Sequence, residues 1–413
     1  MRAKFALLLL LTAVVSCQKS LFSGTPRWMR MQDRHAYFSE DGDEEKPEKE
    51  EEAEAPAAIY VSGLRFPGGV AWRNGDYTGA RLVLWKDGEE VLDLPAGHYP
   101  EPDRHRIRDG HLWWDDSDGS TTFVYRDGEE MLHYPGDEIL RGLLVVDGHI
   151  HTLGQRAGSG GFSYRVDGEE VFSHPSAQVL GSFDDREWEG GALMRYGDEV
   201  CYCFTLPVRL GDDISAEYHV MKGEQLLKRF PAGTAEKLFD LRVLDGSIYR
   251  SQLSGLKSGS LTLFKDDVGQ SLGIKDGVTV HLCRLVPSQT GMLVKGYSTQ
   301  SGTKSYTYWL RGGNGPMQEW DSPLAVADLY VDNPDRSAIY LEGGRVQEIR
   351  DGKKNLTITP GRYLLYTPAC TALVDGSLYA ALSDANGNSH LVLQDGQFQS
   401  YNFNGCLTGI RIE

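Results

Sequence analysis

One pattern of apolar and polar positions returns along the chain: an apolar run, a tight polar turn, and a second apolar run. Its sharpest copies are LWKDGEEVLDLP (Leu84–Pro95), VYRDGEEMLHYP (Val124–Pro135) and YRVDGEEVFSHP (Tyr164–Pro175). An Asp-Gly pair between apolar runs is typical of a two-residue β-hairpin, because both turn residues must tolerate positive φ. The pattern therefore predicts a hairpin at each copy.

Weaker copies continue to the end of the chain and bring the number to eight. With the turn glycine as marker, they stand at Gly88, Gly128, Gly168, Gly223, Gly269, Gly313, Gly352 and Gly396. Upstream Asp-Gly turns, at Asp109, Asp147, Asp245 and Asp375, predict another hairpin before four of these copies. Each repeat then holds four strands, named a to d in chain order. A period near 40 residues built from strands is typical of β-propeller blades.

The apolar runs and the termini predict how the repeats close into a ring. Strand c is apolar at consecutive positions, as in Leu82–Trp85, so both of its faces should be buried between neighbouring blades. Leu407–Glu413 resembles a strand a without a strand b, and Ala58–Gly63 a strand b without a strand a. We therefore predict an all-β fold, an eight-bladed β-propeller closed by pairing of these terminal strands. Seven blades is the alternative, because the b and c strands within Ala338–Thr357 are barely separable.

The first residues predict a processing segment. Arg2 and Lys4 precede an apolar run, Phe5–Val15, that is too short to span a bilayer and fits a secretory signal. The following Val14-Val15-Ser16-Cys17 resembles a bacterial lipobox, which implies removal of residues 1–16 and attachment of lipid, such as palmitate, to Cys17. A plain signal peptide with an incidental cysteine is the alternative. Because Gln18 follows the cysteine, the resemblance implies the outer membrane, with the periplasmic face favoured over the cell surface.

Residues 17–57 are expected to form a disordered tether before the propeller of residues 58–413. Glu40–Glu54 holds ten acids and two lysines, a net charge of −8 out of −17 for the whole chain. Such a segment cannot bury enough apolar surface to offset its ordering entropy, so a solvated spacer is expected, with an acidic partner-binding tail as the alternative. The remaining −9 argues against nucleic acid as the main ligand and against a membrane contact other than the lipid anchor.

Five cysteines remain after Cys17: Cys201, Cys203, Cys283, Cys370 and Cys406. Their spacing matches no zinc motif, and Cys201 and Cys203 should share one face of a strand. We interpret the five as small buried residues, with a Cys370–Cys406 disulfide as the alternative.

The candidates for chemistry are histidines and acids in turns. His111, His149 and His151 follow Asp-Gly turns and are interpreted as strand residues rather than metal ligands. Asp115–Gly119 lacks the spacing of a calcium loop and is interpreted as a polar b–c turn. No GxSxG, GxxxxGKS or HExxH motif occurs, so we predict no catalytic residue, metal or cofactor, while an active site assembled from several blades stays open.

Loops that vary within a repeated scaffold are where function is most often placed, and here they are the b–c and d–a connections. Three such loops lie at Gly63–Gly79, Ser182–Gly191 and Leu206–Ser215. Because Trp and Arg dominate binding hot spots, the loops supply the candidate ligand-binding residues. These are Arg65, Phe66, Trp72, Arg73, Asp184, Trp188 and Arg209.

The repeat frame Ile59-Tyr-Val-Ser-Gly, Leu84-Trp-Lys-Asp-Gly, Val91 and Leu94 resembles uncharacterised bacterial lipoproteins built from repeated YWKDG-type propeller units. The resemblance covers nearly all of Ile59–Glu413 and implies no specific role. The sequence thus predicts a membrane-anchored envelope lipoprotein that acts as a binding or scaffold module for a protein or glycan. A carbohydrate-active enzyme or glycan-binding propeller is the alternative.

Overall fold

The structure is a computed structural model of the whole chain. It describes residues 57–68, 79–97, 105–156, 161–179, 193–196, 199–210, 213–231, 236–244, 246–254, 260–273, 278–288, 291–300, 306–312, 317–322, 326–333, 336–341, 345–350, 353–358, 363–365, 368–374, 377–384, 387–394 and 397–413. The residues predicted to form the signal segment and the tether, 1–56, lie outside these ranges. Within them, no helix has the length and apolar character needed to cross a membrane.

The described residues form eight antiparallel sheets, which we number in chain order. Sheet 1 combines β1 (Ile59–Arg65), β2 (Arg81–Lys86) and β3 (Glu89–Pro95) with the last strand, β34 (Gly405–Ile412). Sheet 2 contains β4 (His105–Arg108), β5 (His111–Ser117), β6 (Thr121–Arg126) and β7 (Glu129–Pro135). Sheet 3 contains β8 (Glu138–Val146), β9 (His149–Arg156), β10 (Phe162–Val166) and β11 (Glu169–His174). Sheet 4 contains β12 (Gln178–Val179), β13 (Leu193–Tyr196), β14 (Glu199–Leu210), β15 (Asp213–Lys222) and β16 (Gln225–Pro231).

The second half of the chain repeats this plan. Sheet 5 contains β17 (Glu236–Leu244), β18 (Ser247–Ser254), β19 (Ser260–Lys265) and β20 (Val268–Ser271). Sheet 6 contains β21 (Val278–Ser288), β22 (Gly291–Gln300), β23 (Tyr306–Gly312) and β24 (Gln318–Ser322). Sheet 7 contains β25 (Val326–Asn333), β26 (Arg336–Leu341), β27 (Arg345–Arg350) and β28 (Lys353–Ile358). Sheet 8 contains β29 (Tyr363–Leu364), β30 (Thr371–Val374), β31 (Ser377–Asp384), β32 (His390–Gln394) and β33 (Gln397–Tyr401), with the 3-10 helix η3 (Pro368–Cys370) before β30.

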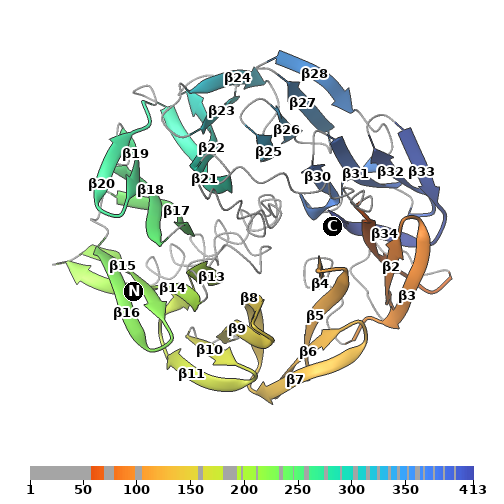
Figure 1. Cartoon of the computed structure of the whole chain (residues 1–413), viewed down its shortest axis with the longest axis horizontal. Coiled ribbons are helices and arrows are strands. Elements are labelled where there is room, and N and C mark those ends of the chain that lie inside the picture. The colour runs from red at the N-terminus through yellow and green to blue at the C-terminus, as the bar shows by residue number, and fades with distance from the viewer. Residues whose placement is uncertain are drawn as a thin grey trace, which may run out of the picture.

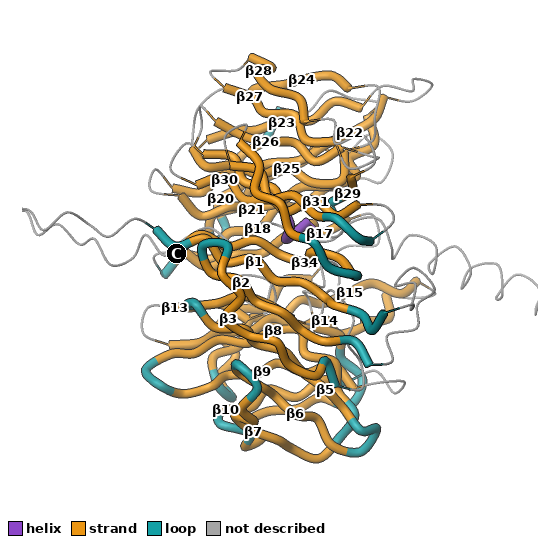
Figure 2. Tube along the Cα trace, turned by 90° about the vertical axis from the view of Figure 1, so that its right-hand side faces the viewer, coloured by secondary structure: helices purple, strands orange, loops and turns teal. Residues whose placement is uncertain are grey.

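The sheets are arranged around a common centre, as in a propeller, with their first strands on the inside and their last strands on the outside, except that β34 is the inner strand of sheet 1 (Figure 1). Figure 2 shows the same arrangement from the side, with most of the described chain drawn as strand. The predicted pairing of the terminal strands is present, because β34 runs antiparallel to β1 from Ile59↔Ile412 to Arg65↔Gly405. The all-β prediction is confirmed, and so is the hairpin unit of the repeat.

The Asp-Gly turns have the backbone that the sequence predicts. Positive φ values of 50° to 53° occur at Asp87, Asp109, Asp127, Asp147 and Asp167, and also at Asp266, which is followed by Asp267 instead of a glycine. The Asp of the c–d turn also fastens strand b of its own sheet: Asp127 donates its N–H to the Leu112 carbonyl at 2.8 Å, and its Oδ1 accepts the Leu112 N–H at 2.8 Å. The same two bonds join Asp87 to Ile59, Asp167 to Ile150 and Asp266 to Ile248. A carboxylate at this position therefore serves both the turn and the cross-strand bond.

Neighbouring sheets bury their apolar faces against one another, as the consecutive apolar residues of strand c predict. The four central residues of β2, Leu82–Trp85, are all buried. Trp85 of sheet 1 packs on Tyr401 and Phe403, with ring centroids 5.3 and 5.1 Å away. Tyr164 of sheet 3 stacks on Tyr202 of sheet 4 at 4.4 Å. These contacts between sheets form the core.

Three local predictions are wrong. Gly269 is not a turn residue: the turn of sheet 5 is Asp266-Asp267, and Gly269 pairs with Phe264 inside the β19–β20 hairpin. Asp115 and Asp116 belong to β5 and are 3% and 4% exposed, so the b–c turn begins only at Asp118, whose side chain satisfies the turn N–H groups. Leu206–Ser215 is not a loop, because β14 and β15 continue their pairing as far as Leu210↔Asp213. In each case strand hydrogen bonds prevail over a turn-like composition.

Candidate functional site on the inner strands and between sheets

Arg65, the first candidate ligand-binding residue, ends β1 and is held by two carboxylates of β3. It forms ion pairs with Glu90 and with Asp93, the latter at 2.7 Å between Nη1 and Oδ2. The hydrogen bond to Glu90 is the main reason that the pKa of Arg65 lies above its ordinary value. A ligand at Arg65 would have to compete with both carboxylates.

Phe66 lies in the core of sheets 1 and 2. Its side chain is 3% exposed and belongs to the cluster that contains Leu64, Leu82 and Trp114. In this position the ring packs between sheets and presents no surface to a ligand. The sequence did not distinguish a core residue from a ligand contact in a loop, because Phe66 directly follows the last residue of a strand.

The other candidates lie mostly outside the described residues. These are Cys17, Trp72, Arg73, Asp184 and Trp188, which stay predictions. Arg209 stands in β14, opposite Ile214 of β15, rather than in a loop.

Arg65 has an equivalent in sheet 3. Arg156 likewise ends strand b, two residues after a glycine, and likewise pairs with the second glutamate of a DGEE turn, Glu170, at 3.5 Å. The two arginines therefore hold the same repeat position. This recurrence favours a structural role for the Arg65–Glu90 pair, in which the end of strand b is tied to strand d.

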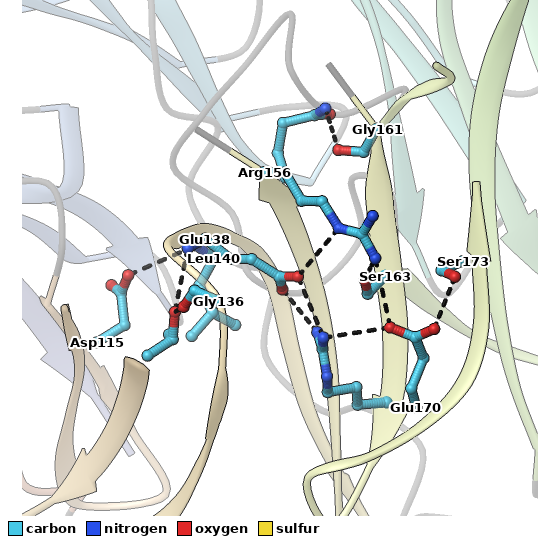
Figure 3. Close-up of polar contacts among 12 residues, drawn as sticks. Asp115, Gly136, Glu138, Leu140, Arg156, Gly161, Ser163, Glu170 and Ser173 are labelled. Carbon is cyan, nitrogen blue, oxygen red and sulfur yellow. Dashed lines mark hydrogen bonds and ion pairs between the residues drawn. The ribbon is translucent and has the colours of Figure 1, made fainter. Parts of the chain in front are cut away.

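A larger polar network surrounds Arg156 and joins sheets 2 and 3 (Figure 3). Glu138, the first residue of β8, receives two hydrogen bonds from Arg165 of β10, at 2.6 and 3.1 Å. The exposed fractions of these two side chains are 1% and 6%. Arg165 also reaches Glu170 at 3.3 Å, and Glu170 accepts the Ser173 hydroxyl at 2.7 Å. The Arg165 guanidinium lies 4.1 Å from the ring centroid of Tyr134 in sheet 2.

The surroundings of Glu138 fit this carboxylate closely. A Cβ at Gly154 would overlap it, so the glycine makes room for the buried ion pair. The Glu138 backbone N–H reaches the Thr122 hydroxyl at 3.1 Å, and the Asp115 carboxylate of sheet 2 accepts the Leu140 N–H at 3.5 Å. A buried charge is tolerated when its partners are held in this way. The sequence analysis missed this pair, although Arg165 in an apolar strand c was a usable signal.

The three histidines after Asp-Gly turns are strand residues, as predicted. His149 Nδ1 lies 2.6 Å from Asp167 Oδ2, and His111 contacts Asp127 in the same way. His151 lies 2.7 Å from the Tyr164 hydroxyl. Among the described residues, no group of three or more His, Cys, Asp or Glu side chains is placed to hold a metal ion.

All five described cysteines are buried free thiols. The interpretation as small buried residues is confirmed, and the alternative Cys370–Cys406 disulfide is not formed. Cys201 and Cys203 share one core cluster, as their spacing predicts. Burial raises the pKa of the Cys201 and Cys283 thiols to about 12, which keeps both protonated at neutral pH.

Cationic side chains gather on the inner strands, and several satisfy the backbone of the adjacent inner strand. Arg108 of β4 donates to the Leu143 carbonyl of β8 at 2.6 Å. Arg195 of β13 donates to Val145 of β8 at 3.0 Å, and Arg284 of β21 donates to Phe239 of β17 at 3.3 Å. The inner strand of each sheet has an edge without a strand partner, and these arginines donate hydrogen bonds to carbonyl groups there. The sequence analysis did not identify this set.

No protein-family model and no curated protein matches the chain. Solved structures resemble it at low identity. BamB from Moraxella catarrhalis is 12% identical with a TM-score of 0.45, covering 77% of this chain and 93% of its own. Dihydro-heme d1 dehydrogenase NirN in complex with DHE is 14% identical with a TM-score of 0.47, covering 86% and 75%. A structure described as the eukaryotic initiation factor is 11% identical with a TM-score of 0.47, covering 86% and 99%. At these sequence identities and TM-scores, the similarities support no statement about function.

Proposed function

We propose that the chain is a lipid-anchored, eight-bladed propeller that acts as a binding or scaffold module in the bacterial envelope. In this proposal Cys17 carries the lipid, residues 18–57 form the tether, and the ligand is a protein. The outer membrane is the expected location, with the propeller on its periplasmic face. The observation that carries the proposal is the combination of a lipobox-like segment with a ring of eight sheets that share one plan.

The strand pairing at the termini supports eight blades with closure in sheet 1. Sheet 1 takes its inner strand from the end of the chain and its other three strands from the beginning. A polar chain reinforces this junction: the Thr408 hydroxyl of β34 lies 3.1 Å from Ser62 Oγ of β1 and 2.6 Å from His105 Nε2 of sheet 2. A ring closed in this way has no terminal blade with an exposed face.

The placement of the titratable groups supports binding over catalysis. The side chains first considered for chemistry, His111, His149 and Asp115, take part in turn and inter-sheet bonds. The loops of the b–c and d–a rim are then the proposed contact surface, with Trp72 and Trp188 as anchors.

Lipid attachment is tested by metabolic labelling with an alkyne analogue of palmitate. The wild-type chain should carry the label and fractionate with the outer membrane, whereas Cys17→Ala should carry none. Label that persists in Cys17→Ala would reject Cys17 as the site. Protease added to intact cells should leave the propeller uncut if it faces the periplasm.

Partner binding is tested by cross-linking in the native envelope followed by affinity capture. One envelope protein should be recovered in a fixed ratio and lost with Trp72→Ala/Trp188→Ala. Phe398→Ala is a matched control, because this exposed ring lies on the outer strand β33. Equal recovery with the double variant would reject the rim, and recovery of no protein would favour the glycan-binding alternative.

A further inference from the structure

Two exposed basic side chains stand on adjacent inner strands of sheets 5 and 6. Lys237 is the second residue of β17, and His281 lies in β21, where the pairing with β22 skips one residue. Both residues are exposed, although neighbouring residues cover part of each side chain. β17 and β21 lie side by side on the inner face of the ring (Figure 1), and the bond from Arg284 to the Phe239 carbonyl joins them. Neither residue is among the candidate contact residues predicted from the loops.

Each of the two side chains is held in place without a carboxylate. Lys237 Nζ lies 4.4 Å from the centroid of the Phe239 ring. His281 stacks on Tyr297 at 5.3 Å, and its Nε2 lies 2.7 Å from the Thr299 hydroxyl. Among the described residues, no ion pair is formed by Lys237 or His281.

Asp240, an acid of β17, already has its partners. Asp240 Oδ1 accepts the Leu241 N–H at 2.8 Å, and Oδ2 accepts the Leu285 N–H at 2.9 Å. Oδ2 also lies 3.2 Å from Arg242 Nε, in an ion pair whose two side chains are 8% and 7% exposed. The carboxylate of Asp240 is thus committed to the junction between the inner strands and to Arg242.

The basic groups interact with one another unfavourably. Burial and then the charge of Arg284 lower the pKa of Lys237. Burial and then the charge of Lys237 lower the pKa of His281. Like charges held together raise the energy of each charged form. An anion placed among them is attracted to each cation, and this attraction offsets their repulsion.

We propose that Lys237, His281 and Arg284 form an anion-binding site that takes the carboxylate or phosphate group of a small ligand. Lys237 and His281 supply exposed donors, and the buried Arg284 guanidinium, which donates to the Phe239 carbonyl, supplies further positive charge. Charge-assisted hydrogen bonds from such donors are the strong ones in proteins. The site lies beside the d–a rim, because Lys237 and His281 stand within the first four residues of β17 and β21, and it goes beyond the proposed scaffold role by adding a small anionic ligand.

The test is calorimetric titration of the full detergent-solubilised chain with inorganic phosphate, galacturonate and galactose at constant ionic strength. We expect phosphate, galacturonate or both to bind, and galactose, which has no charge, to give no heat. Phosphate binding alone would assign a phosphate ligand, and galacturonate binding alone a carboxylate. No binding of either anion, or equal binding of galactose, would overturn the proposal.

Lys237→Gln should weaken binding of the anion by tenfold or more, because it removes a charge-assisted bond. Lys265→Gln is the matched control: Lys265 is also exposed, lies 5.6 Å from the Tyr249 ring and belongs to the same sheet, but stands beside the outer turn. Equal loss in both variants, or unchanged affinity in Lys237→Gln, would overturn the site. These titrations need no lipid or protein partner, so their failure is distinguishable from failure of the scaffold proposal.

Discussion

Glu138 and Arg165 are charged residues in strands that are otherwise mostly apolar, and together they join three strands and two sheets. Their ion pair is nearly dry, so the desolvation of each charge is offset only while the other is present. The same repeat positions carry no such pair in sheet 1, where Trp85 occupies the place of Arg165 opposite the second glutamate of the turn. A single residue thus decides whether that position is part of an apolar core or of an ionic one.

Removing one partner of this pair should be costly. Arg165→Met leaves the Glu138 carboxylate buried without its main donor, and we expect a loss of about 3–5 kcal/mol in the free energy of unfolding. Adding Glu138→Leu should restore part of that loss, because no buried charge remains. Denaturant unfolding measures both.

Glu130→Gln is the control for the preceding prediction, since its exposed pair with His133 should contribute about 1 kcal/mol or less. A loss in Arg165→Met as small as that of Glu130→Gln would show that the buried pair contributes no more to the free energy of unfolding than an exposed pair does.

His149 and His151 are two residues apart on β9 and should titrate at different pH values. The hydrogen bond to Asp167 raises the pKa of His149, whereas burial lowers the pKa of His151. The stabilisation from His149 is therefore present below its unfolded pKa of about 6.5 and is lost as pH rises through the raised folded value. NMR titration of the two imidazoles, assigned with His149→Gln and His151→Gln, checks the order.

Asp167→Asn should return the pKa of His149 towards its ordinary value, and Glu169→Gln should leave it unchanged. If both histidines titrate together in the wild-type chain, the Asp167–His149 bond does not exist in solution.

At the scale of the element, the c–d hairpin does more than reverse the chain. Its Asp bonds strand b of the same sheet, and its Gly packs on strand d of the sheet before. At Gly128 a Cβ would meet both methyl groups of Leu94 at 3.1 Å, so the turn touches sheet 1. The hairpin is therefore also a contact between neighbouring blades.

A comparison of two glycines distinguishes the energy of this contact from the energy of backbone strain. Gly128 and Gly148 have φ values of 93° and 82°, but only Gly128 has a neighbour within 4 Å of a built Cβ. Both Gly→Ala changes should lose about 1–2 kcal/mol for the left-handed backbone. Gly128→Ala should lose more, because Leu94 must also move. Equal losses in thermal unfolding would mean that the contact between sheets 1 and 2 adds nothing.

At the scale of the whole molecule, β34 connects the last residues to both of the first two sheets. It supplies the inner strand of sheet 1, and the Glu413 carboxylate beyond it accepts the N–H groups of Asp109 and Gly110 in the first turn of sheet 2. Trp85 against Tyr401 and Phe403 joins sheet 1 to sheet 8. The ring is thus joined at one place by backbone pairing, side-chain packing and a charged residue.

Ending the chain at Asn404 should disrupt far more than the length removed suggests. Loss of β34 exposes an edge of β1 and one side of sheet 8, so we expect a lower unfolding temperature, a broader transition and aggregation. Glu413→Gln, which keeps the strand, should lower the unfolding temperature by only a few degrees. A truncated chain that unfolds like the Glu413→Gln variant would argue against closure at sheet 1.

The hairpins, their eight-fold recurrence and the pairing of the terminal strands could all be predicted from the sequence alone. The hairpins depend on interactions that are local along the chain, such as the positive φ of Asp127-Gly128. The terminal pairing could be predicted because Leu407–Glu413 has the pattern of a strand a but no strand b follows it. The tertiary structure alone decided which side chains meet: Glu138 with Arg165, Phe66 with the core, and Arg284 with the Phe239 carbonyl. These residues are distant in sequence or separated by bulges that shift the register by one, and a shift of one residue moves a side chain to the opposite face of its sheet.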